Sequence, residues 1–370
     1  MKQIAILTSS RADYGIYLPL LKALKEDPFF ELRIIAFGTH LSPFHGYTIN
    51  QIRNDGFEPD YQIESMLAGD SPNAISTAMA LTALKFADFW KDHQLDFDLV
   101  FCLGDRYEMF AAVTAGIPFN IPFAHLHGGE KTLGAIDNIF RHAITLASKV
   151  HFVSCKEYGD RVAELTGSKD NIYYIGALSL DNLNTLTLFS KEEFLLRFSV
   201  DLNHPTILVT LHPETVTPEM NGIFVEELAT TLLELQKYQV IITLPNADTN
   251  GSLIRRRLLQ LPDQSGNRIL CFENLGSKGY FTAMKFCSFL LGNTSSGIIE
   301  AASFRKDVIN LGYRQEGRKQ SQNIYNVPFN KTSIFEIVAK IEKEPDYTGE
   351  NIYFKGNAAK SICSNLKNIL

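Results

Sequence analysis

The chain has 370 residues, of which 45% are hydrophobic and 21% charged, a composition ordinary for a soluble globular enzyme. Single hydrophobic cores stop growing near about 250–300 residues, so this length indicates two domains. The formal net charge of −6 excludes an overall basic field suited to nucleic acid, and no apolar stretch approaches the about 20 residues of a membrane span. We therefore expect neither nucleic acid nor a membrane as a partner.

The N-terminal residues and the cysteines indicate a reducing, cytoplasmic compartment. The first apolar run is about five residues long, shorter than the about 7–15 residues of a signal peptide core, and is better interpreted as a β-strand. The five cysteines are scattered, odd in number and form no C-x-x-C pair, which argues against a disulfide framework or a structural zinc site. They are Cys102, Cys155, Cys271, Cys287 and Cys363.

Short apolar runs typical of buried strands alternate with amphipathic stretches typical of helices in the first half of the chain. In chain order, the predicted strands are Ile4–Leu7, Leu32–Phe37, Leu99–Cys102, Ile121–His125 and Val150–Val153. The predicted helices are Leu18–Lys25, Ala74–Trp90, Met109–Ala115 and Asp137–Leu146. This alternation indicates βαβ units and a parallel sheet with helices on both faces.

The pattern restarts after Gly176 and a polar, helix-like stretch. The predicted strands of the second half are Thr206–Thr210, Val240–Leu244, Ile269–Phe272, Phe289–Leu291 and Val308–Leu311. The sequence thus predicts an α/β fold of two Rossmann-like, doubly wound domains, residues 1–176 and 177–356, with a terminal helix over 357–370 that packs back on the first. Ligands of such sheets bind beyond the carboxyl ends of the strands, so a cleft between the domains would be lined by strand-to-helix loops.

Three loops of the first domain carry ionisable residues at predicted strand ends. Arg11 follows the first strand at a helix start, where it suits a phosphate or carboxylate, although a solvated arginine beside a Ser or Asp N-cap is an alternative. Asp105 and Arg106 follow the third strand, where helix capping explains Asp105 about as well as a site does. The third loop, His125–Glu130, reads HLHGGE, and its two glycines would let the backbone approach a ligand closely.

A metal site is the main alternative for this third loop, because histidines and carboxylates gather in and after it. However, Asp137, Arg141 and His142 lie on a predicted helix, where Arg141 is one turn from Asp137 and is expected to pair with it. The sequence contains neither H-E-x-x-H nor a Cys/His spacing typical of metal ligands. We therefore expect no metal and no cofactor.

Loops of the second domain carry groups suited to a diphosphate. His212 follows a strand and could donate to a phosphate oxygen, although a lone histidine is more often structural. Asn246 occupies the next comparable loop. The segment Gly292–Gly297 reads GNTSSG and opens a helix, and its hydroxyls and free N–H groups favour a phosphate over simple capping by Ser295.

Further residues extend this edge of the second domain. Glu300 lies one turn into the same helix and could accept hydrogen bonds from ribose hydroxyls. Arg314 and Arg318 follow the last predicted strand and add positive charge. Arginines, a histidine and a helix start would suit the departure of a nucleoside diphosphate, but they would equally suit a glycosyltransferase of the same two-domain shape. Composition and spacing leave both open.

Eight motifs in chain order resemble the hydrolysing UDP-N-acetylglucosamine 2-epimerases of sialic-acid-type biosynthesis. They are RADYG, FGTHLS, GDRYE, HGGE…GAIDN…RHAIT, LHPET, PNAD, GNTSSGIIEA and INLGYRQEGR, and they span nearly the whole chain. The resemblance implies a glycosyltransferase-B type fold, no metal, and a homodimer or homotetramer. It also implies conversion of UDP-N-acetylglucosamine and water to N-acetylmannosamine and UDP, by anti elimination to 2-acetamidoglucal and then hydration with inversion at C2.

The resemblance also implies roles for individual residues. The expected UDP contacts are Arg11, Arg106, His212, Asn246, Leu275 (at the uracil ring), Thr294 (where some relatives have serine), Ser295, Ser296, Gly297, Glu300, Arg314 and Arg318. Asp105 and Asp137 match family carboxylates implicated in acid–base chemistry, and the expected catalytic set also includes His127, Glu130 and His212.

The sequence departs from the family pattern at three points. Relatives read HIEGGE where this chain has His127 in place of the first glutamate, one extra residue lies between Glu130 and Asp137, and Gly15 replaces a serine that touches the nucleotide. Either His127 acts as the base, or Glu130 supplies the carboxylate. The alternatives left open are the same reaction on a UDP- or GDP-linked diacetamido sugar, a non-hydrolysing epimerase, a glycosyltransferase and a non-catalytic nucleotide-sugar sensor.

Overall fold

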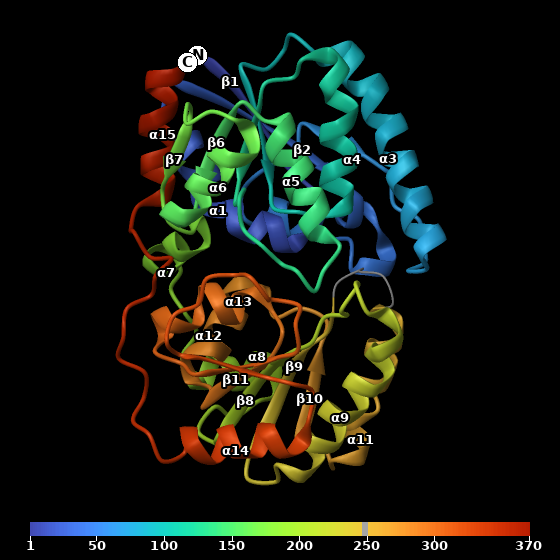
Figure 1. Ribbon diagram of the computed structural model, residues 1–370, viewed down its shortest axis with the longest axis vertical. Coiled ribbons are helices and arrows are strands. Elements are labelled where there is room, and N and C mark those ends of the chain that lie inside the picture. The colour runs from blue at the N-terminus through green and yellow to red at the C-terminus, as the bar shows by residue number, and fades with distance from the viewer. Residues whose placement is uncertain (246–250) are drawn as a thin grey trace. The chain divides into compact units, whose positions relative to one another are not determined.

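The computed structural model describes residues 1–245 and 251–370 and divides the chain into two compact units (Figure 1). The first unit contains Met1–Glu130, Ile136–Thr185 and Tyr353–Leu370, and the second contains Lys131–Ala135 and Leu186–Ile352. The chain therefore enters the second unit briefly after Glu130 before completing the first. The domain boundaries at residues 176 and 356 stay a prediction.

The first unit is built on a seven-stranded, wholly parallel sheet of order β3-β2-β1-β4-β5-β6-β7. The strands are β1 (Lys2–Thr8), β2 (Phe30–Phe37), β3 (Tyr61–Ile63), β4 (Leu99–Leu103), β5 (Phe123–Leu126), β6 (Val150–Val153) and β7 (Ile172–Tyr174). The five predicted strands are confirmed. The structure adds β3 and β7, two short edge strands whose half-exposed residues lack the continuous apolar run of a central strand.

Helices cover both faces of this sheet because alternate residues of each strand point to opposite faces. Ile4 and Ile6 of β1 belong to a core shared with α1 and α15, whereas Ala5 and Leu7 belong to a core shared with α3 and α4. The helices of the unit are α1 (Arg11–Glu26), α2 (Ile49–Asn54), α3 (Pro72–His93), α4 (Tyr107–Gly116), α5 (Asp137–Ala147), α6 (Lys156–Thr166), α7 (Asn182–Thr185) and α15 (Ala358–Ile369).

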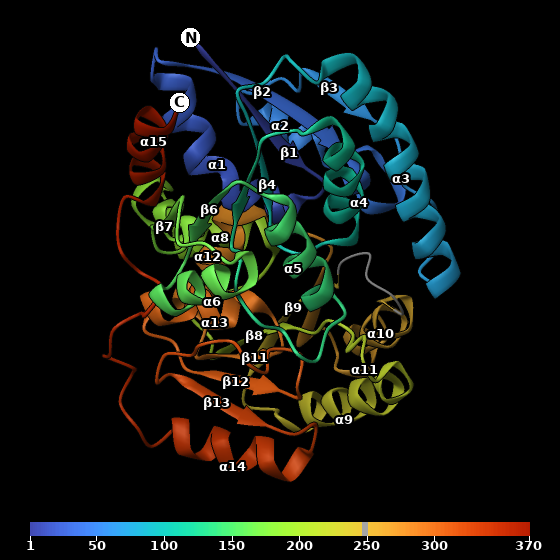
Figure 2. The same cartoon turned by 45° about the horizontal axis from the view of Figure 1, so that its top comes forward.

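The C-terminal helix α15 packs beside α1 (Figure 2). Ile362 and Leu366 of α15 are fully buried in the core that contains α1. The carboxylate of Asp181 accepts hydrogen bonds from the Ala358 and Ala359 N–H groups at 3.0 and 2.8 Å, which satisfies two of the unpaired donors of the helix start. The last helix is thus anchored by both its apolar face and its first turn.

The second unit has a six-stranded parallel sheet of order β10-β9-β8-β11-β12-β13. The strands are β8 (Thr206–Thr210), β9 (Gln239–Thr243), β10 (Ile269–Phe272), β11 (Phe289–Gly292), β12 (Val308–Leu311) and β13 (Ile324–Val327). The helices are α8 (Lys191–Phe198), α9 (Asn221–Glu234), α10 (Gly251–Leu258), α11 (Leu261–Gln264), α12 (Gly276–Phe286), α13 (Ser295–Ile299) and α14 (Lys331–Ile341). One apolar core joins the sheet to α9, α10, α11 and α14.

Both sheets reverse their strand order at one point, and this position is where open α/β sheets bind ligands. In the first unit the reversal lies between β1 and β4, and in the second it lies between β8 and β11. The loops after these four strands carry Arg11, Asp105, His212 and the GNTSSG segment. As for membranes, no helix among the described residues combines the length and the apolar character needed to cross one.

Candidate functional site

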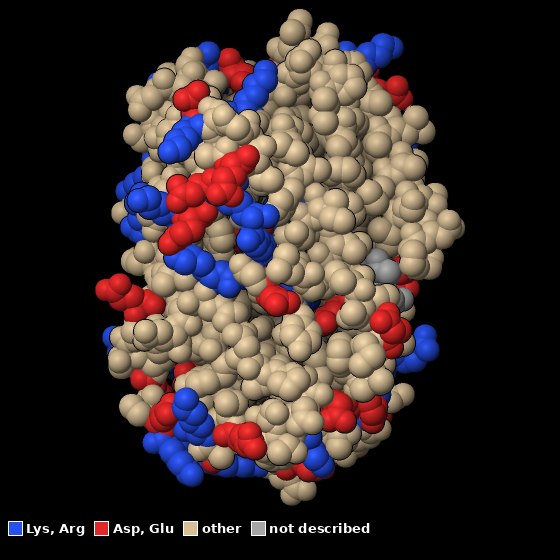
Figure 3. All heavy atoms as spheres, in the orientation of Figure 1, with Lys and Arg blue, Asp and Glu red and all other residues tan. Residues whose placement is uncertain are grey.

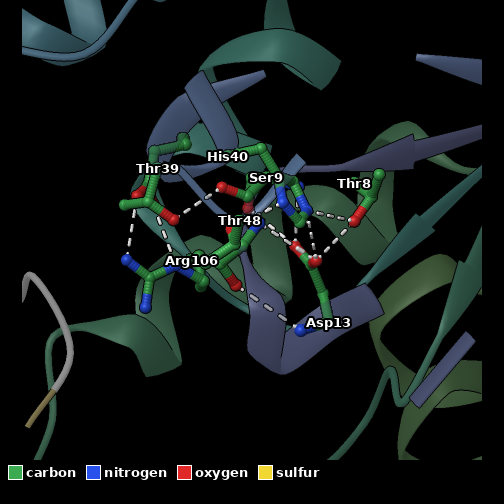
Figure 4. Close-up of polar contacts among 9 residues, drawn as sticks. Thr8, Ser9, Asp13, Thr39, His40, Thr48 and Arg106 are labelled. Carbon is green, nitrogen blue, oxygen red and sulfur yellow. Dashed lines mark hydrogen bonds and ion pairs between the residues drawn. The ribbon is translucent and has the colours of Figure 1, made fainter. Parts of the chain in front are cut away.

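A buried carboxylate, Asp13, organises the loop after β1 (Figure 4). It accepts hydrogen bonds from the Thr8 hydroxyl at 2.7 Å, from the Ser9 N–H and hydroxyl at 2.8 and 2.7 Å, and from the Ser10 N–H at 3.1 Å. Ser10 is the N-cap of α1 and forms a capping box with Asp13, so the helix begins at Arg11 rather than at the predicted Leu18. The loop is therefore a rigid platform that presents Arg11 on the first turn of α1.

His40 joins this platform to the loop after β2. Its ring is fully buried, with Nε2 2.9 Å from the Thr8 hydroxyl and Nδ1 2.8 Å from the Thr48 hydroxyl. Burial lowers the pKa of His40, although the Asp13 carboxylate works in the opposite direction. No role for His40 was expected from the sequence, and the signal that could have identified it is its place in the FGTHLS motif.

Arg106 is the N-cap residue of α4, at the end of the loop after β4. Its guanidinium donates to both oxygens of the buried Glu108 carboxylate, from Nε at 3.2 Å and from NH2 at 2.8 Å. Such a two-point pair fixes the plane of the guanidinium. Figure 4 shows the Arg106 side chain beside Thr39. Arg106, which the sequence predicts to bind a phosphate, therefore lies close to the loop that Asp13 organises.

The first residue of the HLHGGE segment beyond β5 is His127, which has an unusual conformation. His127 has φ +63°, a left-handed backbone that histidine adopts more readily than most residues but that is still uncommon outside glycine. Its Nδ1 lies 2.7 Å from Oε1 of Glu130, which is fully buried and also accepts a hydrogen bond from the Ser154 hydroxyl at 2.8 Å. Within the part of the chain that the structure describes, Nε2 of His127 has no hydrogen-bonding partner.

Arg141 of α5 ties this loop to the loop after β4. It is 2% exposed, donates from NH1 to the His127 carbonyl at 3.0 Å, and forms an ion pair from NH2 with the Asp105 carboxylate. Its NH1 is also 3.7 Å from Oε2 of Glu130. The predicted pairing of Arg141 with Asp137 is wrong, because the partly buried Asp105 and the fully buried Glu130 pair with its guanidinium instead. Asp137 is the first residue of α5.

Packing inside the first unit accounts for the two glycines of the HLHGGE loop, and the idea that they let a ligand approach stays a prediction. A Cβ at Gly129 would lie 2.3 Å from the Tyr158 carbonyl oxygen, and Gly129 has φ +78°. A Cβ at Gly128 would lie 3.0 Å from Nδ1 of the His125 ring. Neither glycine therefore gives information about the ligand.

Two further histidines, His125 of β5 and His151 of β6, are buried side by side in the sheet. His125 bonds through Nε2 to the Gly104 carbonyl at 2.9 Å and through Nδ1 to the Thr145 hydroxyl at 3.1 Å. Burial lowers the pKa of His125 to about 3 and that of His151 to about 4. Both rings are therefore neutral and structural at neutral pH.

This pair predicts that the first unit loses stability in mild acid. The unfolded chain protonates histidine near pH 6.5, whereas the folded rings remain neutral to about pH 3 and 4. The stability that comes from the neutral rings is complete above pH 6.5 and is lost as the pH falls toward those folded values. We expect each histidine to lower the free energy of unfolding by about 2 kcal/mol between pH 7 and pH 5.

Urea unfolding at a series of pH values measures this effect. His151→Gln should show a smaller loss of stability on acidification than the unmodified chain, whereas the same change at the exposed His204 should leave the pH dependence unaltered. Equal pH dependence in His151→Gln and the unmodified chain would contradict the assignment.

In the second unit, Asn293 connects the loops after β8 and β11. Its side chain is fully buried, accepts the His212 N–H at 2.8 Å and donates to the His212 carbonyl at 2.8 Å. Its own carbonyl accepts hydrogen bonds from Arg314 at 3.3 Å and from the side-chain amide of Gln315 at 2.8 Å. The predicted residues His212 and Arg314 are thus held by one asparagine that sequence reasoning passed over.

Glu214 holds the loop after β12 from the other side. Its carboxylate is 2% exposed, and Oε1 accepts the N–H groups of Tyr313 at 2.6 Å and Arg314 at 3.2 Å. The side chain of Asn221 brackets Glu214 through its N–H and carbonyl at 2.9 and 3.0 Å. The backbone that carries Arg314 is therefore determined by a buried carboxylate in the LHPET motif, which was not among the predicted site residues.

The GNTSSG segment forms a short helix, α13, in which Thr294 rather than Ser295 is the N-cap. The Thr294 hydroxyl accepts the Ser296 N–H at 3.4 Å, so the Ser295 hydroxyl is not needed for capping. With only five residues, α13 contributes little macrodipole, and hydroxyl and N–H groups are the donors that remain. A Cβ at Gly297 would lie 3.0 Å from the Val308 side chain, so this glycine serves the contact between α13 and β12.

The structure also places three further predicted residues of the second unit. Leu275 is buried at the N-cap position of α12, and Glu300 is buried at the C-cap of α13. Arg318 is 9% exposed and lines a cavity of about 420 Å³ beyond β12 and β13, together with Tyr313 and Glu316. Asn246 lies outside the described residues.

A family model and several curated relatives match most of the chain. The family model described as UDP-N-acetylglucosamine 2-epimerase matches residues 22–367. Polysialic acid biosynthesis protein P7 of Escherichia coli is 33% identical over 364 residues, 97% of this chain and 92% of that protein. A hydrolysing GDP/UDP-N,N'-diacetylbacillosamine 2-epimerase of Campylobacter jejuni is 34% identical over 329 residues, 89% of this chain and 85% of that protein.

Solved structures share the fold. The crystal structure of a UDP-GlcNAc 2-epimerase from Neisseria meningitidis bound to UDP-GlcNAc matches with a TM-score of 0.82 over 100% of both chains, at 18% sequence identity. At that identity the likeness establishes the two-sheet, glycosyltransferase-B type architecture and nothing about the substrate.

Proposed function

The chain belongs to the UDP-N-acetylglucosamine 2-epimerase family, and from that premise we propose that it is a hydrolysing 2-epimerase that converts UDP-N-acetylglucosamine and water to N-acetylmannosamine and UDP. The observation that carries the proposal is the His127–Glu130 pair, whose ring nitrogen Nε2 has no partner among the described residues. A buried carboxylate that orients one nitrogen of an imidazole leaves the other nitrogen to exchange protons with a substrate.

The first step is elimination. His127 Nε2 removes the C2 proton, the C2–H electron pair forms the C1=C2 bond, and the C1–O bond breaks with its electrons leaving on UDP. Because C2 is a weak carbon acid, departure of UDP must run ahead of proton removal and give C1 cationic character. Arg11, Arg106 and Arg314 would stabilise the charge that develops on the diphosphate.

Hydration completes the reaction. The oxygen of water bonds to C1 of 2-acetamidoglucal while that water gives up a proton to Asp105, and a protonated acid delivers a proton to C2, which takes the C1=C2 electron pair so that the configuration inverts. We assign that acid to Asp137 and keep Asp105, whose carboxylate is held by Arg141, as the group that orients water. We assign Glu130 to orienting His127 rather than to contact with the sugar, and this is supported by its complete burial and its bonds to His127 and Ser154. His127 is therefore the proposed replacement for the missing family glutamate.

A second substrate has support from a relative. The Campylobacter jejuni protein named above acts on a GDP- or UDP-linked diacetamido sugar, and its identity to this chain equals that of protein P7 within one percentage point. The same elimination and hydration would apply, because the C4 and C6 substituents take no part in either step.

Product analysis decides between these substrates. The protein is incubated in deuterated water with UDP-N-acetylglucosamine or with UDP- or GDP-diacetylbacillosamine, and NMR follows the nucleotide and the free sugar. Free N-acetylmannosamine with deuterium at C2 supports the primary proposal, and a free diacetamido sugar with C2 deuterium supports the second. Interconversion of a nucleotide sugar without hydrolysis would reject both proposals, and so would transfer to an added acceptor or recovery of all three substrates intact.

We also propose that the chain forms a homodimer or homotetramer through helices of the first unit. Figure 3 shows that the surface over α3, α4 and α5 is almost free of charged side chains. Apolar residues are exposed there, Leu84 at 64%, Ile117 at 51%, Ile139 at 69% and Leu146 at 60%. An uncharged face can pair with a copy of itself without like-charge repulsion, even though each chain carries a net charge of −6.

A single charge should disrupt this face. We expect Leu84→Glu to weaken self-association by about 100-fold or more, because the carboxylate would be buried without a partner. Sedimentation velocity over a range of protein concentrations measures the change. Leu196→Glu, at an equally apolar and 87% exposed position on α8 of the second unit, is the matched control. A monomeric unmodified chain, or equal effects of both variants, would reject the assignment.

A further inference from the structure

One short segment of the chain belongs to the second unit although its neighbours on both sides belong to the first. This segment, Lys131–Ala135, lies between Glu130 and Ile136 in sequence. Glu130 is the partner of His127, and Asp137 follows Ile136 directly. The segment is therefore covalently connected at both ends to the groups proposed to move protons.

Within the second unit, this segment packs on the loop that carries Arg314. The Leu133 N–H donates to the Glu316 carbonyl at 3.0 Å. Gly134 lies so close to that loop that a Cβ on it would be 2.5 Å from the Tyr313 carbonyl carbon and oxygen and 2.7 Å from the Arg314 Cα. Because these are backbone atoms, no side-chain rotation could relieve the overlap. Gly134 has an ordinary φ, so space rather than conformation requires glycine here.

The Arg314 loop is also held by hydrogen bonds inside the second unit. Glu214 accepts the Tyr313 and Arg314 N–H groups, and the Arg314 guanidinium donates to the Asn293 carbonyl. A group that contacts the Arg314 side chain therefore acts on a backbone that cannot yield toward Glu214. Gly134 touches Tyr313 and Arg314, so a displacement of their backbone would reach Gly134.

We propose that Gly134 is a positioning residue that couples the nucleoside diphosphate at Arg314 to the proton-transfer groups. Bound UDP would set the position of the Lys131–Ala135 segment, and with it Glu130, His127 and Asp137. UDP would then remain a participant after its bond to the sugar has broken, because hydration needs the geometry that its diphosphate maintains. This inference rests on the proposed function and adds a role for a product in the second step.

The second step can be measured alone. The unmodified protein is given the 2-acetamidoglycal of the sugar that it releases, in deuterated water, with and without saturating UDP, and NMR records the rate of hydration. We expect UDP to raise this rate by about tenfold or more, within the range usual for coupled sites. By reciprocity, a non-reacting analogue of the glycal should tighten UDP binding by the same factor as UDP tightens binding of that analogue.

Gly134→Ala tests the contact itself. UDP affinity, measured by calorimetry, should stay within about threefold of the unmodified chain, while the acceleration of hydration by UDP should largely disappear. Gly222→Ala is the matched control, because a Cβ at Gly222 meets nothing within 4 Å. If Gly134→Ala does not fold, Leu133→Pro is the second variant. It removes the Leu133 N–H that donates to the Glu316 carbonyl, and the Leu133 side chain is 48% exposed, so its replacement disturbs little packing.

The outcomes separate this inference from the proposed function. If the unmodified protein releases no free sugar from any nucleotide sugar, the proposed function fails. If it hydrates the glycal equally well with and without UDP, or if Gly134→Ala retains the full acceleration, the coupling is overturned and the function stands. If Gly134→Ala lost UDP binding, the Gly134 contact would serve only to hold the Arg314 loop in place, and the coupling would also be overturned.

Discussion

Replacing His127 with asparagine is expected to lower kcat by about 10²- to 10⁴-fold, the range typical of removing a general base. Asparagine is the informative substitution because it tolerates the left-handed conformation at φ +63°, and its amide can still donate to Glu130. The variant therefore retains the loop and loses the ring nitrogen. Steady-state kinetics on the substrate identified by product analysis, together with calorimetric UDP binding, measures the effect. UDP affinity should remain close to that of the unmodified chain.

Ser154→Ala provides the comparison for His127→Asn. It removes one of the hydrogen bonds to Oε1 of Glu130 but leaves the imidazole in place, so we expect a far smaller loss of kcat. Near-normal turnover in His127→Asn would exclude His127 as the base and return that role to a carboxylate, with Asp105 as the first candidate.

Replacing Arg141 with methionine is expected to destabilise the first unit by about 3–5 kcal/mol and to abolish most activity. The guanidinium is 2% exposed and is paired with Asp105 and Glu130, so its removal leaves buried carboxylate charge without compensation. It also removes the donor to the His127 carbonyl, which helps hold that residue at positive φ. Urea unfolding and turnover measure the two effects.

Two variants make the Arg141 result interpretable. Arg161→Met changes a half-buried arginine of α6 that bonds to the neutral ring of His142, and it should cost about 1 kcal/mol or less. Arg141→Lys keeps the charge but lacks the planar fork that reaches His127 and Asp105 together, so it should recover stability more than kcat. If Arg141→Met were as stable and active as Arg161→Met, the proposed bridge would be wrong.

Local signals account for the positions in the fold that were predicted correctly. Parallel sheets have buried apolar strands with polar loops at their carboxyl ends. These two features locate Arg11, Asp105 and His212 after β1, β4 and β8. The Ser10–Asp13 capping box was also visible as a spacing of three residues, although the sequence does not show that Asp13 is buried. The edge strands β3, β7 and β13 lack such signals because they are short and only partly buried.

Long-range contacts overturn the local expectation at Arg141. A helix spacing of four residues favours a pair with Asp137 at the surface, where such a pair contributes only about 0.2–0.5 kcal/mol. The observed partner, Asp105, is 36 residues away in sequence and lies where burial makes a charge pair much stronger. The glycines of the HLHGGE loop show the same limit, since a sequence cannot distinguish room for a ligand from room for the Tyr158 carbonyl.

The departure from the family pattern at His127 shows most clearly what residue order determines and what packing adds. The order of residues established the α/β class, the parallel strands and the family, because these depend on periodicity and on motifs that are local in the chain. It left His127 and Glu130 equally eligible as the base. The fold gives them different surroundings, because packing buries Glu130 completely against Ser154 and leaves Nε2 of His127 without a partner among the described residues, and burial depends on residues distant in sequence.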